Sequence, residues 1–175
     1  MLDAAGVRYV ALKPDVDEAG AKGRLDNPRE IAGELAAMKA CSIAGEWVIG
    51  SDSVVSVEGR RFDKPRNRDE AAEHLRFFSG RQMELTSAAA LARNSRRDWT
   101  YVDTAKLQVR DLTEGFIQTY LDAEWPEVGY CVGVFRLEGR GVQLFSAIDG
   151  DHFTILGMPL LPLLGALRER ELMPA

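Results

Sequence analysis

The chain is poor in the residues that build disulfide frameworks and metal clusters. Its 175 residues include two cysteines, Cys41 and Cys131, and two histidines, His74 and His152. Two cysteines are too few for a disulfide framework and have no metal-type spacing, so free thiols in a reducing compartment are expected. The histidines have no partner at ligand spacing, and we assign them to no site. These absences favour a cytoplasmic protein.

Long apolar runs and an excess of positive charge are missing too. No run approaches the ~18 apolar residues that a membrane span needs, and the start Met1-Leu2-Asp3 has no leader pattern, so neither a membrane anchor nor export is expected. The chain has 22 Lys and Arg against 27 Asp and Glu, a net charge of −5. Because a net-negative surface repels phosphodiester backbones, general nucleic-acid binding is not expected, whereas a small anionic ligand in a local basic pocket is compatible.

What the chain does contain is enough apolar sequence for a core. Hydrophobic residues make up 46% and charged residues 28%, which is typical of a globular protein. The length favours one domain over residues 1–175, or two lobes around a shared cleft.

Hydrophobic periodicity and capping residues predict helices and strands in alternation. The expected helices are 28–44, the segment from the cap Asn67 to Phe78, 113–121 and one opened by Pro159; the expected strands are 7–12, 47–57, 83–92, 99–109 and 142–148. Hairpins dominate the middle of the chain, so we predict an α/β fold with a mixed, twisted central sheet flanked by helices.

Asp52 is the most unusual residue of the sequence. It stands between Ser51 and Ser53 within the apolar strand 47–57, where a buried and unpaired carboxylate would be costly. Asp52 should therefore face a cleft, a cation or a metal, or else be satisfied by backbone amides at a strand end. The residue alone does not decide between these interpretations.

Two lysines stand at positions that make them candidate site residues. Lys39 follows Leu35 by four residues on the apolar side of the helix 28–44, an unusual position for an ammonium group, although its stem could pack while its head reaches water. Lys64 shortly precedes the helix capped by Asn67, and helix N-termini favour phosphate. Loop lysines are, however, more often only solvated.

An acidic turn, Asp15-Val16-Asp17-Glu18, follows the first expected strand. Hard oxygen ligands suit magnesium, and phosphates of a substrate complete its shell. The turn is a candidate cation site, although acidic turns are common on protein surfaces.

These residues belong to a series of short motifs that runs along nearly the whole chain. The series is Asp17-Glu18, Ala36-Ala37-Met38-Lys39-Ala40, Ile49-Gly50-Ser51-Asp52-Ser53-Val54-Val55, Lys64-Pro65, Glu70-Ala71-Ala72, Ser79-Gly80, Gly133 to Gly141, Ile148-Asp149-Gly150-Asp151 and Gly157-Met158-Pro159-Leu160. In this order the motifs resemble the Maf family of nucleoside triphosphate pyrophosphatases, although no single motif is specific.

The resemblance implies an enzyme that hydrolyses a nucleoside triphosphate between its α- and β-phosphates with Mg²⁺ or Mn²⁺, in the cleft of a two-lobed Maf/ITPase-like fold, as a homodimer. By the same resemblance Asp52 is the general base or a metal-linked carboxylate, and Glu18 is a companion acid for metal or water. Lys39 and Lys64 would bind the triphosphate and offset charge on the leaving pyrophosphate.

The N-terminus departs from the family pattern. Maf proteins begin with a strand and a phosphate-binding loop of the form Ser-x-Ser-x-Arg-Arg, which we do not find after Met1-Leu2-Asp3. We therefore expect an N-terminally short Maf-like domain. Either the start is set too late, or the protein is a short form with weakened or absent catalysis.

Glu138 bears on the choice of base. Family members that prefer dTTP or UTP carry Gln here, whereas Glu resembles the subgroup that acts on 7-methyl-GTP. A carboxylate can accept from both guanine donors, N1–H and the exocyclic amine, and its charge suits a cationic purine; Glu138 could instead pair with Arg136 or Arg140. We expect 7-methyl-GTP as substrate, the alternatives being a dTTP/UTP pyrophosphatase or a catalytically impaired nucleotide-binding protein.

Overall fold

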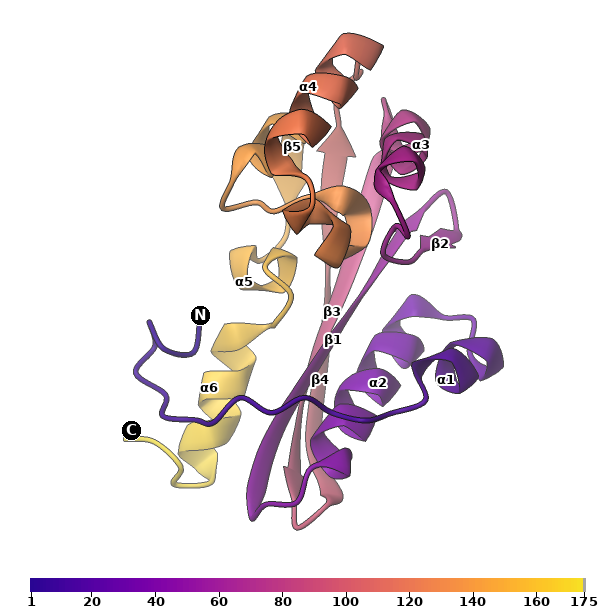
Figure 1. The fold of residues 1–175 in the computed structure, drawn as a ribbon. Helices are drawn as coiled ribbons and strands as arrows, with labels where there is room; N and C mark the ends of the chain where they lie inside the picture. Colours follow the sequence, from indigo (N-terminus) through magenta and orange to yellow (C-terminus); the bar gives the residue numbers. More distant parts are fainter. Residues whose placement is uncertain (175) are drawn as a thin grey trace. The chain divides into compact units, whose positions relative to one another are not determined.

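The computed structural model describes residues 1–174, and its helices and strands are labelled in Figure 1. The chain forms two compact units. Unit 1 comprises residues 1–53, 86–103 and the C-terminal segment from Asp151, and unit 2 comprises residues 54–85 and 104–150.

The strands form one sheet in the order β2-β1-β3-β4-β5. The long strands β1 (Trp47–Val57), β3 (Gln82–Arg93) and β4 (Arg96–Val109) contribute residues to both units, whereas β2 (Arg60–Phe62) and β5 (Phe145–Asp149) belong to unit 2.

Neighbouring strands run antiparallel. The residue register pairs β1 with β2 and β4 with β5 in this direction. The amide of Asn94, after the end of β3, donates to the carbonyl of Glu46, before the start of β1, at 3.0 Å; at the other ends of these strands Arg81 pairs with Glu58 at 3.2 Å. The α/β class with flanking helices is confirmed, and its sheet is antiparallel where a mixed direction was expected.

Helices cover both faces of the sheet in unit 1 (Figure 1). The helices of this unit are α1 (Glu18–Arg24), α2 (Pro28–Ser42), α5 (His152–Ile155) and α6 (Leu160–Glu169). On one face, Leu160, Leu163 and Leu167 of α6 pack in a cluster with Leu91 of β3, and each buried leucine contributes about 1.5–3 kcal/mol. On the other face α2 lies against β1 and β4.

Unit 2 packs two helices beside its part of the sheet. They are α3 (Arg68–Phe78) and α4 (Glu114–Glu124), and three short 3-10 helices follow, η1 (Glu127–Tyr130), η2 (Val132–Val134) and η3 (Arg140–Leu144). Leu75 of α3 and Leu121 of α4 are fully buried. On the surface, Arg76 of α3 pairs with Glu114 of α4 at 2.7 Å. Together these contacts join the two helices.

Local sequence explains where the confirmed helices start. The side chain of Asn27 accepts from the amide of Arg29 at the start of α2, and Asn67 does the same for Glu70 at the start of α3. Thr113 caps α4 in the same way. Each such cap satisfies an amide that has no partner inside the helix, a contribution of about 1 kcal/mol.

Two predicted strands are wrong wholly or in part. Residues 7–12 are extended but are not a strand of the described sheet, because none of its strands takes them as a neighbour. The expected strand 142–148 begins as η3 and becomes β5 only at Phe145. The turn between β3 and β4 is also shorter than expected, since Asn94 and Ser95 make it alone with φ of +49° and +61°.

Within residues 1–174, no helix is long and apolar enough to cross a membrane.

Candidate active site

Asp52 projects from β1 toward α2. Side chains alternate along a strand, so Asp52 shares a face with Gly50 while Ser51 and Ser53 face the other way. A Cβ atom on Gly50 would stand 2.1 Å from the carbonyl oxygen of Ala36 in α2. Only glycine permits this approach, and it brings the helix backbone against the strand two residues before Asp52.

Lys39 of α2 meets Asp52 across this close contact. Its Nζ donates to Oδ1 of Asp52 at 2.5 Å and to Oε1 of Glu18 at 2.9 Å. The side chains of Asp52 and Lys39 are only 10% and 18% exposed, whereas that of Glu18 is 43% exposed. The sequence-predicted residues Asp52, Lys39 and Glu18 therefore form one cluster, with Glu18 on its solvent side.

Glu18 is placed by the first turn of α1. Asp17 caps this helix, its carboxylate accepting from the amide of Gly20 at 2.9 Å. Lys22, one turn further on, lies 3.9 Å from the second oxygen of Glu18. Lys22 was not among the residues predicted from the sequence, although its spacing of four residues from Glu18 is a signal that could have identified it.

The electrostatics of the cluster favour a basic carboxylate. Burial raises the pKa of Asp52, the bond and charge of Lys39 oppose this, and the charge of Glu18 raises it again, so the Asp52 pKa lies above its ordinary value. Burial lowers the pKa of Lys39, but its bonds to Asp52 and Glu18 outweigh this and raise it. Lys39 is thus held as a cation beside an Asp52 that accepts protons more readily than a solvated aspartate.

A groove of about 720 Å³ opens beside Lys39. Its walls include the consecutive residues 7–12 on one side and 48–51 of β1 on the other. The lining is mostly apolar, and Lys39 and Arg8 bring positive charge to this groove of unit 1.

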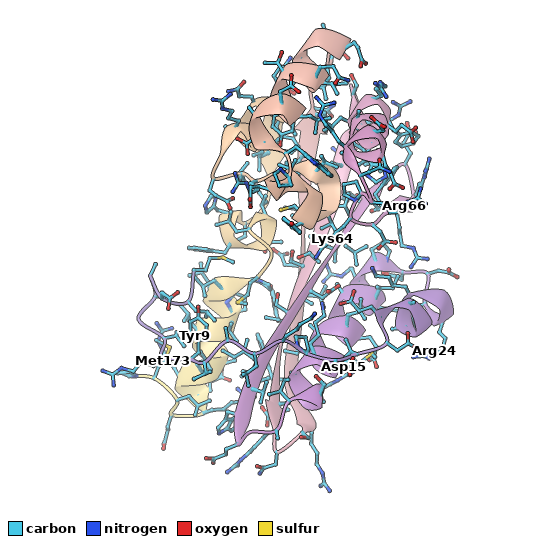
Figure 2. All side chains as sticks on the ribbon, in the orientation of Figure 1. Tyr9, Asp15, Arg24, Lys64, Arg66 and Met173 are labelled. Carbon is cyan, nitrogen blue, oxygen red and sulfur yellow. The ribbon has the colours of Figure 1, made fainter. Side chains whose placement is uncertain are left out.

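Lys64 and Glu138 lie in unit 2. Lys64 is exposed on the segment between β2 and α3, where Figure 2 shows it close to Arg66. Glu138 is exposed on the segment between η2 and η3. Burial raises the pKa of the Cys131 thiol, the charge of Glu138 raises it further, and the charges of Arg136 and Lys64 lower it. The charges of Lys64 and Glu138 therefore act on the same thiol of unit 2.

Arg136 forms an ion pair with a residue other than Glu138. Its Nη2 donates to Oε2 of Glu124 at 3.0 Å, and Glu124 is buried. Within residues 1–174 no ion pair joins Glu138 to Arg136 or Arg140. The structural alternative for Glu138, an ion pair with one of these arginines, is therefore not what the protein forms.

Comparisons with known proteins identify the family. The family model described as Maf-like protein matches residues 1–170. The chain belongs to the Maf family. This Maf protein is 42% identical to a nucleoside triphosphate pyrophosphatase of Nitrobacter hamburgensis, over 99% of the chain and 89% of that relative. It is 43% identical to a 7-methyl-GTP pyrophosphatase of Rhizobium meliloti, over 97% and 89%, and 42% identical to a nucleoside triphosphate pyrophosphatase of Sphingopyxis alaskensis, over 99% and 92%. The resemblance inferred from the motifs is confirmed.

The acidic residues of this Maf protein suit a cation that is shared with a ligand. Within residues 1–174 no group of three or more His, Cys, Asp and Glu could hold a metal by itself. Glu18 and Asp52 bring two carboxylates to one ammonium group, and Mg²⁺ is commonly held by one or two carboxylates plus substrate phosphates. The donor set therefore fits a divalent cation that arrives with phosphate, and the acidic turn contributes Glu18 to it while Asp17 serves as a helix cap.

Proposed function

We propose that this Maf protein is a nucleoside triphosphate pyrophosphatase that releases a nucleoside monophosphate and pyrophosphate. The observation that carries the proposal is the cluster of Asp52, Lys39 and Glu18 within unit 1. It combines a carboxylate of raised pKa with a lysine held as a cation, and these are the two groups that water activation and phosphate binding need. The names of the relatives, nucleoside triphosphate pyrophosphatase and 7-methyl-GTP pyrophosphatase, support the same reaction.

In the proposed reaction, Asp52 accepts a proton from the attacking water. The water oxygen bonds to the α-phosphorus while the bond from that phosphorus to the oxygen bridging the β-phosphate breaks, and pyrophosphate leaves with the bridging oxygen. Lys39 binds Oδ1 of Asp52, and within residues 1–174 no donor bonds its Oδ2, so this oxygen is available to the water. Because Asp52 is nearly buried, its position is fixed before the substrate arrives.

Lys39 and Lys64 are the proposed phosphate ligands. Lys39 is shared between two carboxylates, so a triphosphate would compete for its ammonium protons and add a third anionic partner. Lys64 is exposed and would contribute its charge to the leaving pyrophosphate. We further propose that Lys64 and Glu138 are also nucleotide ligands and that residues 1–175 act as a single Maf-like domain.

We propose Mg²⁺ or Mn²⁺ as the cofactor, with Glu18 and Asp52 as its protein ligands. A divalent cation bound there would neutralise phosphate charge and lower the pKa of bound water. The residues that hold it would still depend on Lys39 for their spacing, because Lys39 contacts both carboxylates.

We propose 7-methyl-GTP as the substrate, with Glu138 recognising the base. Glu138 is exposed, and no arginine among the described residues 1–174 forms an ion pair with it, so its carboxylate can accept from N1–H and the exocyclic amine of a guanine. One relative at 43% identity is named for 7-methyl-GTP. We also propose that the protein is a homodimer and that it acts in the cytoplasm.

The test is release of pyrophosphate from a nucleotide panel. The purified protein is incubated with Mg²⁺ or Mn²⁺ and 7-methyl-GTP, GTP, dTTP, UTP or ATP, and both pyrophosphate and monophosphate are quantified against Asp52→Asn. We expect release above this control, greatest with 7-methyl-GTP and shifted toward dTTP and UTP in Glu138→Gln. Release from dTTP and UTP alone would reject the proposed base, and tight nucleotide binding without release from any substrate would reject the activity.

A further inference from the structure

The face of β1 opposite to Asp52 carries a chain of buried hydroxyl groups. Ser51 and Ser53 flank Asp52 and both point to this face. Oγ of Ser51 lies 2.8 Å from the carbonyl oxygen of Gly157 and 2.9 Å from that of Ala88. Oγ of Ser53 lies 2.7 Å from Oγ of Ser87 and 3.3 Å from the carbonyl oxygen of Gly157. Both serine hydroxyls therefore lie near one carbonyl in the turn between α5 and α6, and Ser51 is the nearer of the two.

Proton counting fixes the direction of the chain. Ser87 donates its single hydroxyl proton to the carbonyl of Thr154 at 2.8 Å, so it accepts from Ser53. Thr154 in turn donates its hydroxyl proton to Oδ2 of Asp103 at 2.8 Å. Ser87 and Thr154 are fully buried, where an unpaired hydroxyl would cost about 1–3 kcal/mol. Removing the Ser53 hydroxyl would leave Ser87 without its donor.

The chain of hydroxyl groups joins β1 to the turn between α5 and α6, which has a backbone conformation that favours glycine. Gly157 has a φ of +103°, and a Cβ atom on it would stand 3.5 Å from Oγ of Ser53. Its amide donates to the carbonyl of Thr154 at 3.1 Å. A hydrogen bond within the turn holds its backbone in place, so Ser51 and Ser53 lie against a rigid segment.

We propose that Ser51 and Ser53 are positioning residues for Asp52, an inference that rests on the proposed function. On one face of β1, α2 approaches Gly50 and presents Lys39 to Asp52. On the other face Ser51 ties the strand to Gly157, and Ser53 ties it to Ser87 of β3. Residues 51–53 are held from both sides, so the Asp52 carboxylate is aimed at Lys39 and at the water it activates. The serines point away from Asp52 and are not nucleophiles.

The predicted consequence is a loss of turnover without a matching loss of substrate affinity. Misplacement of a catalytic group by about 1 Å can cost about 100-fold in rate. For Ser51→Ala/Ser53→Ala we expect kcat to fall about 10- to 100-fold, with KM changed less than about twofold, because neither serine is a proposed phosphate or base ligand. Ser53→Ala alone should lose less, since Ser51 still binds Gly157.

The experiment measures kcat and KM for wild type, the alanine variants, Ser53→Thr and Ser56→Ala. Ser56→Ala is the matched control, because Ser56 is a buried serine of the same strand outside this chain of hydroxyls. Ser53→Thr keeps the hydroxyl and should restore the kcat that Ser53→Ala loses.

A second measurement keeps failure of the inference distinct from failure of the proposed function. Crystal structures of the same proteins without nucleotide give the distance between Nζ of Lys39 and Oδ1 of Asp52, which is 2.5 Å in the wild type. A longer distance in Ser51→Ala/Ser53→Ala, absent from Ser56→Ala, supports positioning even if wild type releases no pyrophosphate. An unchanged distance, or a folded Ser53→Ala and double variant with kcat within twofold of wild type, overturns it. If the double variant does not fold, Ser53→Ala and Ser53→Thr decide the question alone.

Discussion

The charged residues of the two units differ in how firmly they are held. In unit 1, Asp52 and Lys39 come from a strand and a helix, are nearly buried and bind each other directly. In unit 2, Lys64 and Glu138 are exposed on connecting segments. Regular elements fix side chains more precisely than loops do, and exposed loop groups can adapt to a ligand. We therefore propose that the unit 1 cluster determines the rate and that the unit 2 residues determine affinity and selectivity.

Replacing Asp52 should cause the largest loss of activity of any change in either unit. For Asp52→Asn we expect pyrophosphate release to fall about 10³-fold, within the range that loss of a general base causes. Stability should change little, because burial already disfavours the Asp52 charge and Lys39 keeps its bond to Glu18. The measurements are kcat at saturating nucleotide and the midpoint of thermal unfolding. A folded variant that retains kcat would move the base elsewhere.

Lys39→Met should reduce both activity and stability. The variant leaves Asp52 nearly buried without its cation, which we expect to cost about 2 kcal/mol. Pyrophosphate release should fall about 100-fold, because phosphate charge also loses a partner. Urea unfolding gives the stability, and the matched control is Lys39→Met/Asp52→Asn, which removes the stranded charge. The double variant should recover part of the lost stability; equal stability of the single and double variants would show that the pair is not coupled.

Sequence alone could single out the members of the unit 1 cluster because their signals are local. Asp52 interrupts an apolar strand, and Lys39 lies on the apolar side of its helix at a spacing of four from Leu35. That these residues converge was expected from the family resemblance and not from their spacing. The close contact that unites them depends on Gly50, whose role is visible only when α2 is seen against β1.

Other features could not be predicted because they depend on neighbours distant in sequence. Residues 7–12 have strand-like alternation, but a strand needs a hydrogen-bonding neighbour that the described sheet does not supply. The partner of Arg136 is Glu124, on the preceding helix, where the sequence suggested Glu138. The hydroxyl chain behind Asp52 joins residues about 35 to 105 positions apart and leaves no periodic signal.

Lys64→Ala tests whether the exposed residues of unit 2 contribute to substrate affinity. Because Lys64 is exposed, we expect unchanged stability and a rise in KM of about tenfold, equivalent to about 1.4 kcal/mol of binding, with a smaller effect on kcat. Arg66→Ala is the matched control, an exposed cation two residues away that pairs with Glu70. Steady-state kinetics at constant ionic strength separate the two. If the control raises KM equally, Lys64 acts only through general charge.

The smallest expected effect lies in unit 2 and concerns His74. His74 packs edge-on against Phe62 and beside Phe78, with ring centroids 5.1 and 5.9 Å apart, and burial lowers its pKa against the opposing charge of Glu70. The unfolded chain therefore binds this proton before the folded protein does, so the contribution of His74 is full above a pH of about 6.5 and declines as pH falls through the lowered pKa. We expect the thermal midpoint of wild type to fall slightly more than that of His74→Phe over this interval. Parallel curves for the two proteins would show that the aromatic contact does not disfavour the protonated ring.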